Sequence, residues 1–226
     1  MTYLVIETST DYGVVVLVDE TEGCAVRAAS CFEGRRSLSM KLLPRIDALL
    51  QSEKLTLQDL TGIGVGIGPG SFTGLRVGVT TAKILAMSLD KPVYGLGTFH
   101  AYAALAAGPG TVVTAARSRR NELYAQIFEQ GLIPEAAFTI ADADLAARCT
   151  LLQHSGPLHV IGAASAIQDL PGSRTLVEWP PIAGLAIALR ERMAAGPADD
   201  ARNLVPAYIA NPIITTPRDS RVLPKG

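Results

Sequence analysis

One segment, Gly62–Ala86, constrains the fold of this chain more than the rest of its sequence does. A strand of alternating glycine and apolar residues ends in a Gly-Pro-Gly turn, and a helix follows directly. Every fourth residue of that helix is glycine or alanine, which gives it a stripe of small side chains along one face. Glycine inside a helix costs roughly 1 kcal/mol relative to alanine, so the stripe predicts that another backbone packs closely there. The small-residue stripe consists of Gly74, Gly78, Ala82 and Ala86.

The composition is that of a chain with little charge and a large apolar fraction. Of the 226 residues, 48% are hydrophobic and 18% are charged, and the mean hydropathy is +0.27. The length suffices for one large domain or two small ones with a substantial core. The apolar surplus predicts that another subunit covers part of the surface. With a net charge of −1 the chain has no overall basic field, so we expect contact with tRNA only through a partner.

Cysteine usage and hydropathy predict a cytoplasmic protein with no membrane segment. The three cysteines form no CxxC pair, which favours a reducing compartment over a disulfide framework or a zinc knuckle. No apolar run reaches the ~18–20 residues of a membrane span, and the opening MTYLVIETS is typical of a strand rather than of a signal peptide. The cysteines are Cys24, Cys31 and Cys149.

The N-terminal half predicts an antiparallel meander followed by helix-linked strands. Three strands in succession indicate the meander, and apolar residues at helical spacing then predict an amphipathic helix over Ser37–Leu50. The glycine-rich strand and its helix follow, then one more strand and a helix that begins near Thr98. This order favours a mixed sheet covered by helices. The other predicted strands of this half are Tyr3–Ser9, Gly13–Asp19, Cys24–Phe32 and Pro92–Leu96.

A Gly-Pro-Gly sequence at residues 108–110 is the clearest predicted domain boundary. It separates an N-terminal subdomain, residues 1–105, from a C-terminal subdomain, residues 106–226, whose tail over residues 216–226 is expected to be mobile. The second subdomain is expected to contain a hairpin around the basic loop at residues 117–120. Its predicted strands are Thr111–Ala116, Glu122–Phe128 and His159–Ile161, and its predicted helices are Ala141–Arg148 and Ile182–Ala195.

No nucleotide-binding or hydrolase motif in the sequence is complete. The chain has no G-x-x-x-x-G-K-[ST], and the glycines of the turn miss the G-x-G-x-x-G spacing. Ser71 lies outside a G-x-S-x-G motif, although a helix N-terminus there could hold an anion. The three histidines have no metal-ligand spacing. We therefore predict neither catalytic residues nor a metal site, and a tRNA contact by Arg117, Arg119 or Arg120 is left open.

One polar cluster, at the end of the first strand, could contact a nucleotide. Glu7 is followed by Thr8, Ser9 and Thr10 and then by a hairpin. In actin-like ATPases, an acid and hydroxyl residues at this place bring phosphate and its metal ion to the hairpin amides. A second acidic phosphate loop is missing from the sequence. Weak nucleotide binding at Thr8, Ser9 and Thr10 is therefore an alternative to a purely structural role.

Four segments together resemble the TsaB (YeaZ) family, whose members are bacterial partners of the TsaD ligase in making threonylcarbamoyladenosine in tRNA. The most specific segment is GIGPGSFTGLRVGVTTAKILA. The others are YLVIETSTDYGVVVL, SLSMKLLPRIDALL and RSRRNELYAQIF, and the segments follow the family's order. A weaker similarity is found at Val205–Tyr208.

The resemblance implies an α/β fold of the duplicated actin-like type (ASKHA, ribonuclease H-like), with mixed sheets flanked by helices. It also implies a non-catalytic scaffold subunit that supports TsaD, rather than an enzyme. In this pathway TsaC makes threonylcarbamoyl-adenylate, TsaD transfers the group to adenosine, and TsaE supplies an ATPase. Family members pair through their first two helices, with TsaD or with a second copy. No cofactor is implied, although ATP or ADP at a subunit boundary is left open.

The same resemblance places the partner surface on the two helices that flank the glycine-rich strand. The stripe of the second helix and the apolar face of the first are expected to form it. The alternative is that the stripe packs only on the chain's own sheet, because close helix–sheet packing also favours glycine. The predicted interface residues are Leu42, Ile46, Leu49, Gly74, Leu75, Gly78, Ala82 and Ala86.

Three departures from the family pattern affect residues that could take part in catalysis, and none of them affects the small-residue stripe. Glu7 stands where the family has Asp, Leu38 where it has His, and Ala115 where it has an Asp two residues before Arg117. The last change removes a carboxylate that could hold a metal ion or water at a phosphate. We therefore expect no intrinsic ATP hydrolysis. Two alternatives are a stand-alone actin-like nucleotide-binding protein or weak ATPase, and a protease-like hydrolase.

Overall fold

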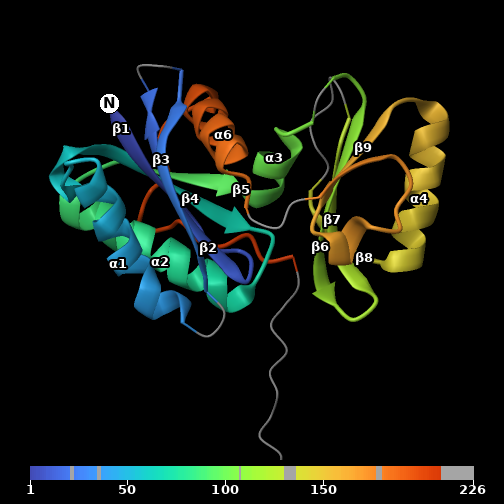
Figure 1. Ribbon diagram of the computed structural model, residues 1–226, viewed down its shortest axis with the longest axis horizontal. Coiled ribbons are helices and arrows are strands. Elements are labelled where there is room, and N and C mark those ends of the chain that lie inside the picture. The colour runs from blue at the N-terminus through green and yellow to red at the C-terminus, as the bar shows by residue number, and fades with distance from the viewer. Residues whose placement is uncertain (21–22, 35–36, 107, 130–135, 177–179, 210–226) are drawn as a thin grey trace, which may run out of the picture.

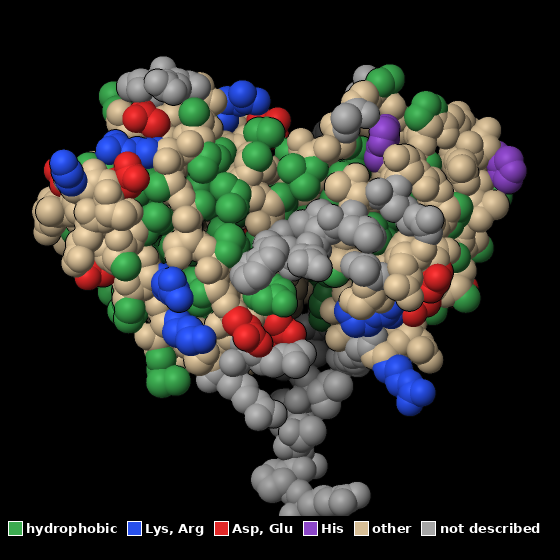
Figure 2. Space-filling model, viewed as in Figure 1, with side chains coloured by type: hydrophobic (Ala, Val, Ile, Leu, Met, Phe, Trp, Pro, Cys, Tyr) green, Lys and Arg blue, Asp and Glu red, His purple; other side chains and the backbone are tan. Residues whose placement is uncertain are grey.

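The chain folds into two lobes, each built on a five-stranded mixed sheet (Figure 1). A computed structural model describes residues 1–20, 23–34, 37–106, 108–129, 136–176 and 180–209. Figure 2 shows a notch between the lobes, with hydrophobic side chains gathered along the centre of this face. None of the described helices is long and apolar enough to cross a membrane.

The first sheet has the strand order β3-β2-β1-β4-β5. Its first three strands form the predicted antiparallel meander. β4 then pairs in parallel with β1, and β5 pairs in parallel with β4, because a helix precedes each of these two strands. Both faces of β1 and β2 are buried, which accounts for the runs of Val, Ile and Leu in these strands. The strands are β1 (Thr2–Glu7), β2 (Tyr12–Asp19), β3 (Ala25–Glu33), β4 (Leu60–Gly68) and β5 (Val93–Gly97).

The second sheet, in the order β10-β9-β6-β7-β8, repeats this topology. An antiparallel meander again comes first, β9 pairs in parallel with its first strand, β6, and β10 pairs in parallel with β9. The duplicated α/β fold expected for an actin-like protein is thereby confirmed. The strands are β6 (Thr111–Arg119), β7 (Glu122–Phe128), β8 (Phe138–Ala141), β9 (Leu158–Gly162) and β10 (Ser173–Leu176).

Helices cover both faces of the first sheet. On one face, α1 and α2 pack over the core side chains of β1, β2 and β4. On the other face, α3 and α6 pack over β1, β2 and β5. The helices of the first lobe are α1 (Leu38–Ser52), the 3₁₀ turn η2 (Leu57–Asp59), α2 (Phe72–Leu89), α3 (Thr98–Ala103) and α6 (Ile182–Ala195), and those of the second lobe are α4 (Asp142–Ser155) and α5 (Ala164–Ile167).

The predicted assignment of residues 106–226 to the second subdomain is wrong at its C-terminal end. Leu185 and Leu189 of α6 are fully buried in the core of the first lobe. Beyond α6, the amide of Asp199 donates a hydrogen bond to the carbonyl of Val93. The ammonium group of Lys83 donates hydrogen bonds to the backbone carbonyls of residues 202 and 204. The chain therefore returns to the first sheet, where burying these apolar side chains stabilises the fold.

Three elements of the second lobe, namely β8, α5 and β10, were not expected from the sequence. Each contains only four residues, too few to show a period. Their positions match β3, α2 and β5 of the first lobe, so α5 is the short counterpart of the long helix α2. The predicted mobile tail, residues 216–226, lies outside the described residues.

Candidate functional site

The small-residue stripe of α2 faces the chain's own first strand and the turn that follows it. A Cβ at Gly74 would overlap the carbonyl oxygen of Thr8, and a Cβ at Gly78 would overlap the Thr8 hydroxyl. That hydroxyl donates a hydrogen bond of 2.9 Å to the carbonyl oxygen of Gly74. The sequence thus predicted a close backbone approach correctly, and the backbone is that of residue 8.

The predicted partner-interface residues are wrong, because they are buried inside the chain. All of them are buried within the first lobe, where a partner cannot reach them in the folded subunit. The structure therefore supports the alternative of packing on the chain's own sheet. The buried residues concerned are Leu42, Ile46, Leu49, Gly74, Leu75, Gly78, Ala82 and Ala86.

The same two helices carry a second apolar face that points away from the sheet. Met40 and Leu43 on α1, and Ile84 and Met87 on α2, expose 54–71% of their surface. We call these four residues the α1–α2 outer face; the two helices lie on the same side of the sheet (Figure 1). The sequence signal was present in α1, where Leu42 and Leu43 are adjacent and must point to different sides of a helix.

The hydroxyl cluster after β1 is closed to ligands. Thr8 and Ser9 are buried, and the carbonyl of Ser9 accepts the amide of Ser71 at 2.6 Å. Thr10 uses its hydroxyl within the hairpin, where it accepts the Tyr12 amide at 3.1 Å. The Gly-Pro-Gly turn therefore packs against Ser9, and Thr8 and Ser9 are shielded from solvent. Binding of ATP or ADP at a subunit boundary stays a prediction.

Glu7 is a fully buried carboxyl beneath this turn. One oxygen accepts the Ser9 amide at 2.7 Å, and the other accepts the Thr98 hydroxyl at 2.9 Å. Burial raises the pKa of the Glu7 carboxyl above its ordinary value of 4.5, and the hydrogen bonds from Ser9 and Thr98 oppose this rise. Gly66 of β4 leaves the room that the carboxyl occupies. Glu7 thus ties β1 to α3 and is shielded from solvent.

We expect the stability of the Glu7→Gln variant, relative to that of the wild type, to increase as pH rises. The pKa of the Glu7 carboxyl is higher in the folded chain than in the unfolded chain. As pH rises above the unfolded pKa, the unfolded chain therefore loses this proton while the folded chain keeps it. The wild type loses stability through this range, until pH exceeds the folded pKa. Below both pKa values, the difference in unfolding free energy between the variant and the wild type is constant. Urea unfolding between about pH 4 and about pH 8 measures it. Glu33→Gln, at an exposed position, is the control for removing a carboxylate from the surface. A difference that falls with pH would show that the hydrogen bonds outweigh burial.

The corresponding place in the second lobe holds an ion pair in place of an acidic loop. The side chain of Ala115 is buried in the core of that lobe. Arg117 places one nitrogen 2.7 Å from each carboxylate oxygen of Asp142, and it also donates to the carbonyl of Ser165. Arg117 thereby joins the end of β6 to α4 and α5. Arg120 is exposed, and a tRNA contact through it stays untested.

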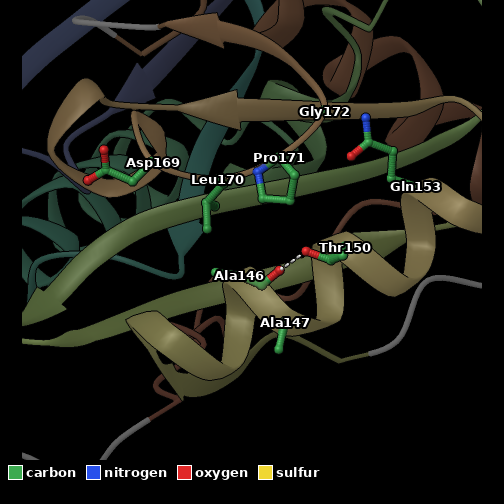
Figure 3. Close-up of a pocket in the computed structure, with 8 residues that line it drawn as sticks. All are labelled: Ala146, Ala147, Thr150, Gln153, Asp169, Leu170, Pro171 and Gly172. Atoms are coloured by element: carbon green, nitrogen blue, oxygen red, sulfur yellow. Dashed lines mark hydrogen bonds between the residues drawn. The ribbon is translucent and has the colours of Figure 1, made fainter.

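A hollow of about 610 Å³ opens between α4 and the turn before β10 (Figure 3). One wall is formed by Ala146, Ala147 and Thr150, and the Thr150 hydroxyl donates a hydrogen bond to the Ala146 carbonyl oxygen. Asp169 is the only charged residue among those that line it. Within the described part of the chain, no three His, Cys, Asp or Glu side chains are grouped so as to hold a metal ion. The hollow thus offers no grouping of an acid, a base and a nucleophile.

Comparisons with known proteins find one family model and several similar proteins. Residues 33–159 match the family model of TsaD, tRNA N6-adenosine threonylcarbamoyltransferase. The tRNA threonylcarbamoyladenosine biosynthesis protein TsaB of Bacillus subtilis is 29% identical over 227 residues, which cover 92% of this chain and 94% of the relative. An uncharacterized protein of Mycobacterium tuberculosis is 33% identical over 78% of this chain and 77% of its own length. The solved structure of YeaZ from Pseudomonas aeruginosa has a TM-score of 0.75 at 22% identity, over 92% of this chain and 99% of that one.

Proposed function

The chain belongs to the TsaB (YeaZ) family of tRNA threonylcarbamoyladenosine biosynthesis proteins, and we propose that it is a non-catalytic subunit that binds and supports the TsaD transferase. The observation that carries the proposal is the α1–α2 outer face. Four of the nine large hydrophobic residues that are exposed in the described part of the chain lie on these two helices. An exposed apolar surface on paired helices is typical of a protein interface.

The geometry around Glu7 supports an accessory role over independent catalysis. The carboxyl is fully buried and is hydrogen-bonded to Ser9 and Thr98. A general base or a metal-holding acid must reach its substrate, and this carboxyl does not. The alternative of a stand-alone actin-like nucleotide-binding protein or weak ATPase requires this buried carboxyl to become accessible.

The proposed complex includes further partners. We propose that the chain meets TsaE through the complex with TsaD, pairs with a second copy when TsaD is missing, and meets tRNA only indirectly. The near-neutral net charge of −1 agrees with an indirect role in RNA binding. A cytoplasmic location is part of the same proposal.

Reconstitution tests the proposal. TsaC, TsaD and TsaE from the same organism, with threonine, bicarbonate, Mg-ATP and substrate tRNA, are expected to form the modified nucleoside only when this chain is added. The chain alone is expected to release no phosphate from ATP above the buffer background. Modification at the same rate without the chain would refute the accessory role. Turnover of order one per second by the chain alone, abolished in Glu7→Ala, would instead establish an ATPase.

A further inference from the structure

A groove runs between α3 and α6, on the opposite face of the first sheet from α1 and α2. It consists of two hollows, of about 340 and 320 Å³, which share the side chains of His100 and Glu191. We call it the α3–α6 groove. The larger hollow lies at the junction of the lobes, because its wall includes β6 and β7 as well as the two helices. Its apolar lining consists of Ala103, Ala104, Pro109, Val112, Phe128 and Ile187.

Carboxylates give the α3–α6 groove its charge. Glu191 lies 3.4 Å from the Nε2 atom of His100, both side chains are about half exposed, and Glu129 is exposed at the edge of the larger hollow. Arg192 is the one lysine or arginine among the lining residues. Its guanidinium is already bonded to the carboxylate of Asp199 at 2.8 Å. Among the described residues, neither Glu129 nor Glu191 is paired with a lysine or arginine, and Glu191 lies beside the imidazole of His100.

The groove is built from rigid parts. The ring of His100 meets the ring of Phe128 edge-on, with 5.4 Å between centroids, so a residue of α3 contacts a strand of the other lobe. Gly184 of α6 lets that helix approach α3 so closely that a Cβ would overlap the carbonyl oxygen of Ala101. Walls that are fixed in this way lose little conformational freedom when a ligand binds.

We propose that the α3–α6 groove binds a short segment of a partner protein that carries apolar side chains and a lysine or arginine. The apolar lining gains by burying aliphatic side chains, and the carboxylates of Glu129 and Glu191 select a cation beside them. Such a segment fits the helix-in-groove mode of recognition. A compact small molecule is disfavoured, since both hollows are open to solvent and would leave it largely exposed.

This binding site is separate from the proposed TsaD surface. The first sheet lies between the α3–α6 groove and the α1–α2 outer face, so one partner can occupy each at the same time. The inference therefore does not depend on the proposed function, and variants of the two surfaces can be tested independently.

Fluorescence anisotropy with a labelled helical peptide of leucine and lysine tests the groove, and a peptide with glutamate in place of lysine is its control. The lysine peptide is expected to bind the full chain and to slow amide exchange in α3 and α6. The double variant Glu129→Gln/Glu191→Gln keeps the shape and should weaken binding about fivefold. Ala104→Trp fills the larger hollow and should abolish binding, with circular dichroism confirming that it is folded. Leu43→Asp on α1 should leave binding unchanged.

Several results would overturn the proposal. These are equal binding of the two peptides, unchanged binding by the double glutamine variant, and amide protection in α1 and α2 in place of α3 and α6. Analytical sedimentation tests whether a second copy of the chain occupies the groove instead. If the chain forms a dimer that Ala104→Trp dissociates, a second copy fills the groove and the assignment to a partner's basic segment is wrong.

Discussion

Replacing Gly74 with alanine is expected to destabilise the chain by about 2 kcal/mol, although the same change in an exposed helix would stabilise it. Alanine gains roughly 1 kcal/mol in helix propensity. At this position, however, its Cβ would overlap the backbone carbonyl of Thr8, which cannot turn aside as a side chain could. Overpacking of this kind costs about 1–3 kcal/mol, and the 2.9 Å hydrogen bond from Thr8 to Gly74 is weakened as well.

Urea unfolding at neutral pH measures this effect, and Thr80→Ala is the matched control. Thr80 lies on the exposed side of the same helix, so alanine there should leave the unfolding midpoint level or raise it slightly. If Gly74→Ala were as stable as the wild type, the close approach of α2 to residue 8 would not contribute to folding. Far-UV circular dichroism of the folded variant should keep the helical signal, since the strain is local.

Replacing Ile84 with aspartate is expected to weaken binding to TsaD at least thirtyfold, which corresponds to about 2 kcal/mol and is typical of a central interface residue. Ile84 exposes 59% of its surface and is one of the four residues of the α1–α2 outer face. Burying an unpaired carboxylate against a partner is costly, whereas the isolated chain keeps this position in water. The melting temperature of the free chain should therefore barely change.

Leu151→Asp is the matched control for the interface. Leu151 exposes 70% of its surface on α4, in the second lobe, and the chemical change is the same. Titration calorimetry with TsaD should find wild-type affinity for this variant. Equal loss of affinity in both variants would point to a general effect of charge, and full binding by Ile84→Asp would exclude the outer face as the TsaD surface.

The pattern of apolar residues in the sequence was enough to predict most of the first lobe. The meander, the helix beginning near Ser37 and the helix Ile182–Ala195 lie within a few residues of their predicted positions. The first two strands of the meander are apolar, β-branched runs bounded by turn residues, and the helices are long segments. The four-residue elements β8, α5 and β10 lack that length. Their positions are fixed by pairing with neighbours in the second sheet.

The glycines in the stripe of α2 predicted that another backbone packs closely against this helix. The sequence did not show which backbone it is. A missing Cβ gives the same signal whether the approaching backbone belongs to a partner or to residue 8 of the same chain. The same limit applies to α1, whose adjacent leucines indicate two apolar sides without telling which of them faces the sheet.

Only the tertiary structure decided where α6 packs and whether Glu7 can reach a ligand. The composition of α6 is compatible with either sheet, and its place on the first one depends on the area that Leu185 and Leu189 bury there. The sequence likewise presents Glu7 as an acid at a strand end, the position of a phosphate-binding group in actin-like ATPases. Its closure depends on Gly66 and on the turn at residues 68–70, which are distant in the chain and meet Glu7 and its neighbour Ser9 only when β4 pairs with β1. Burial is a property of the assembled chain, because the atoms that exclude water from a group come from elements that local sequence does not specify.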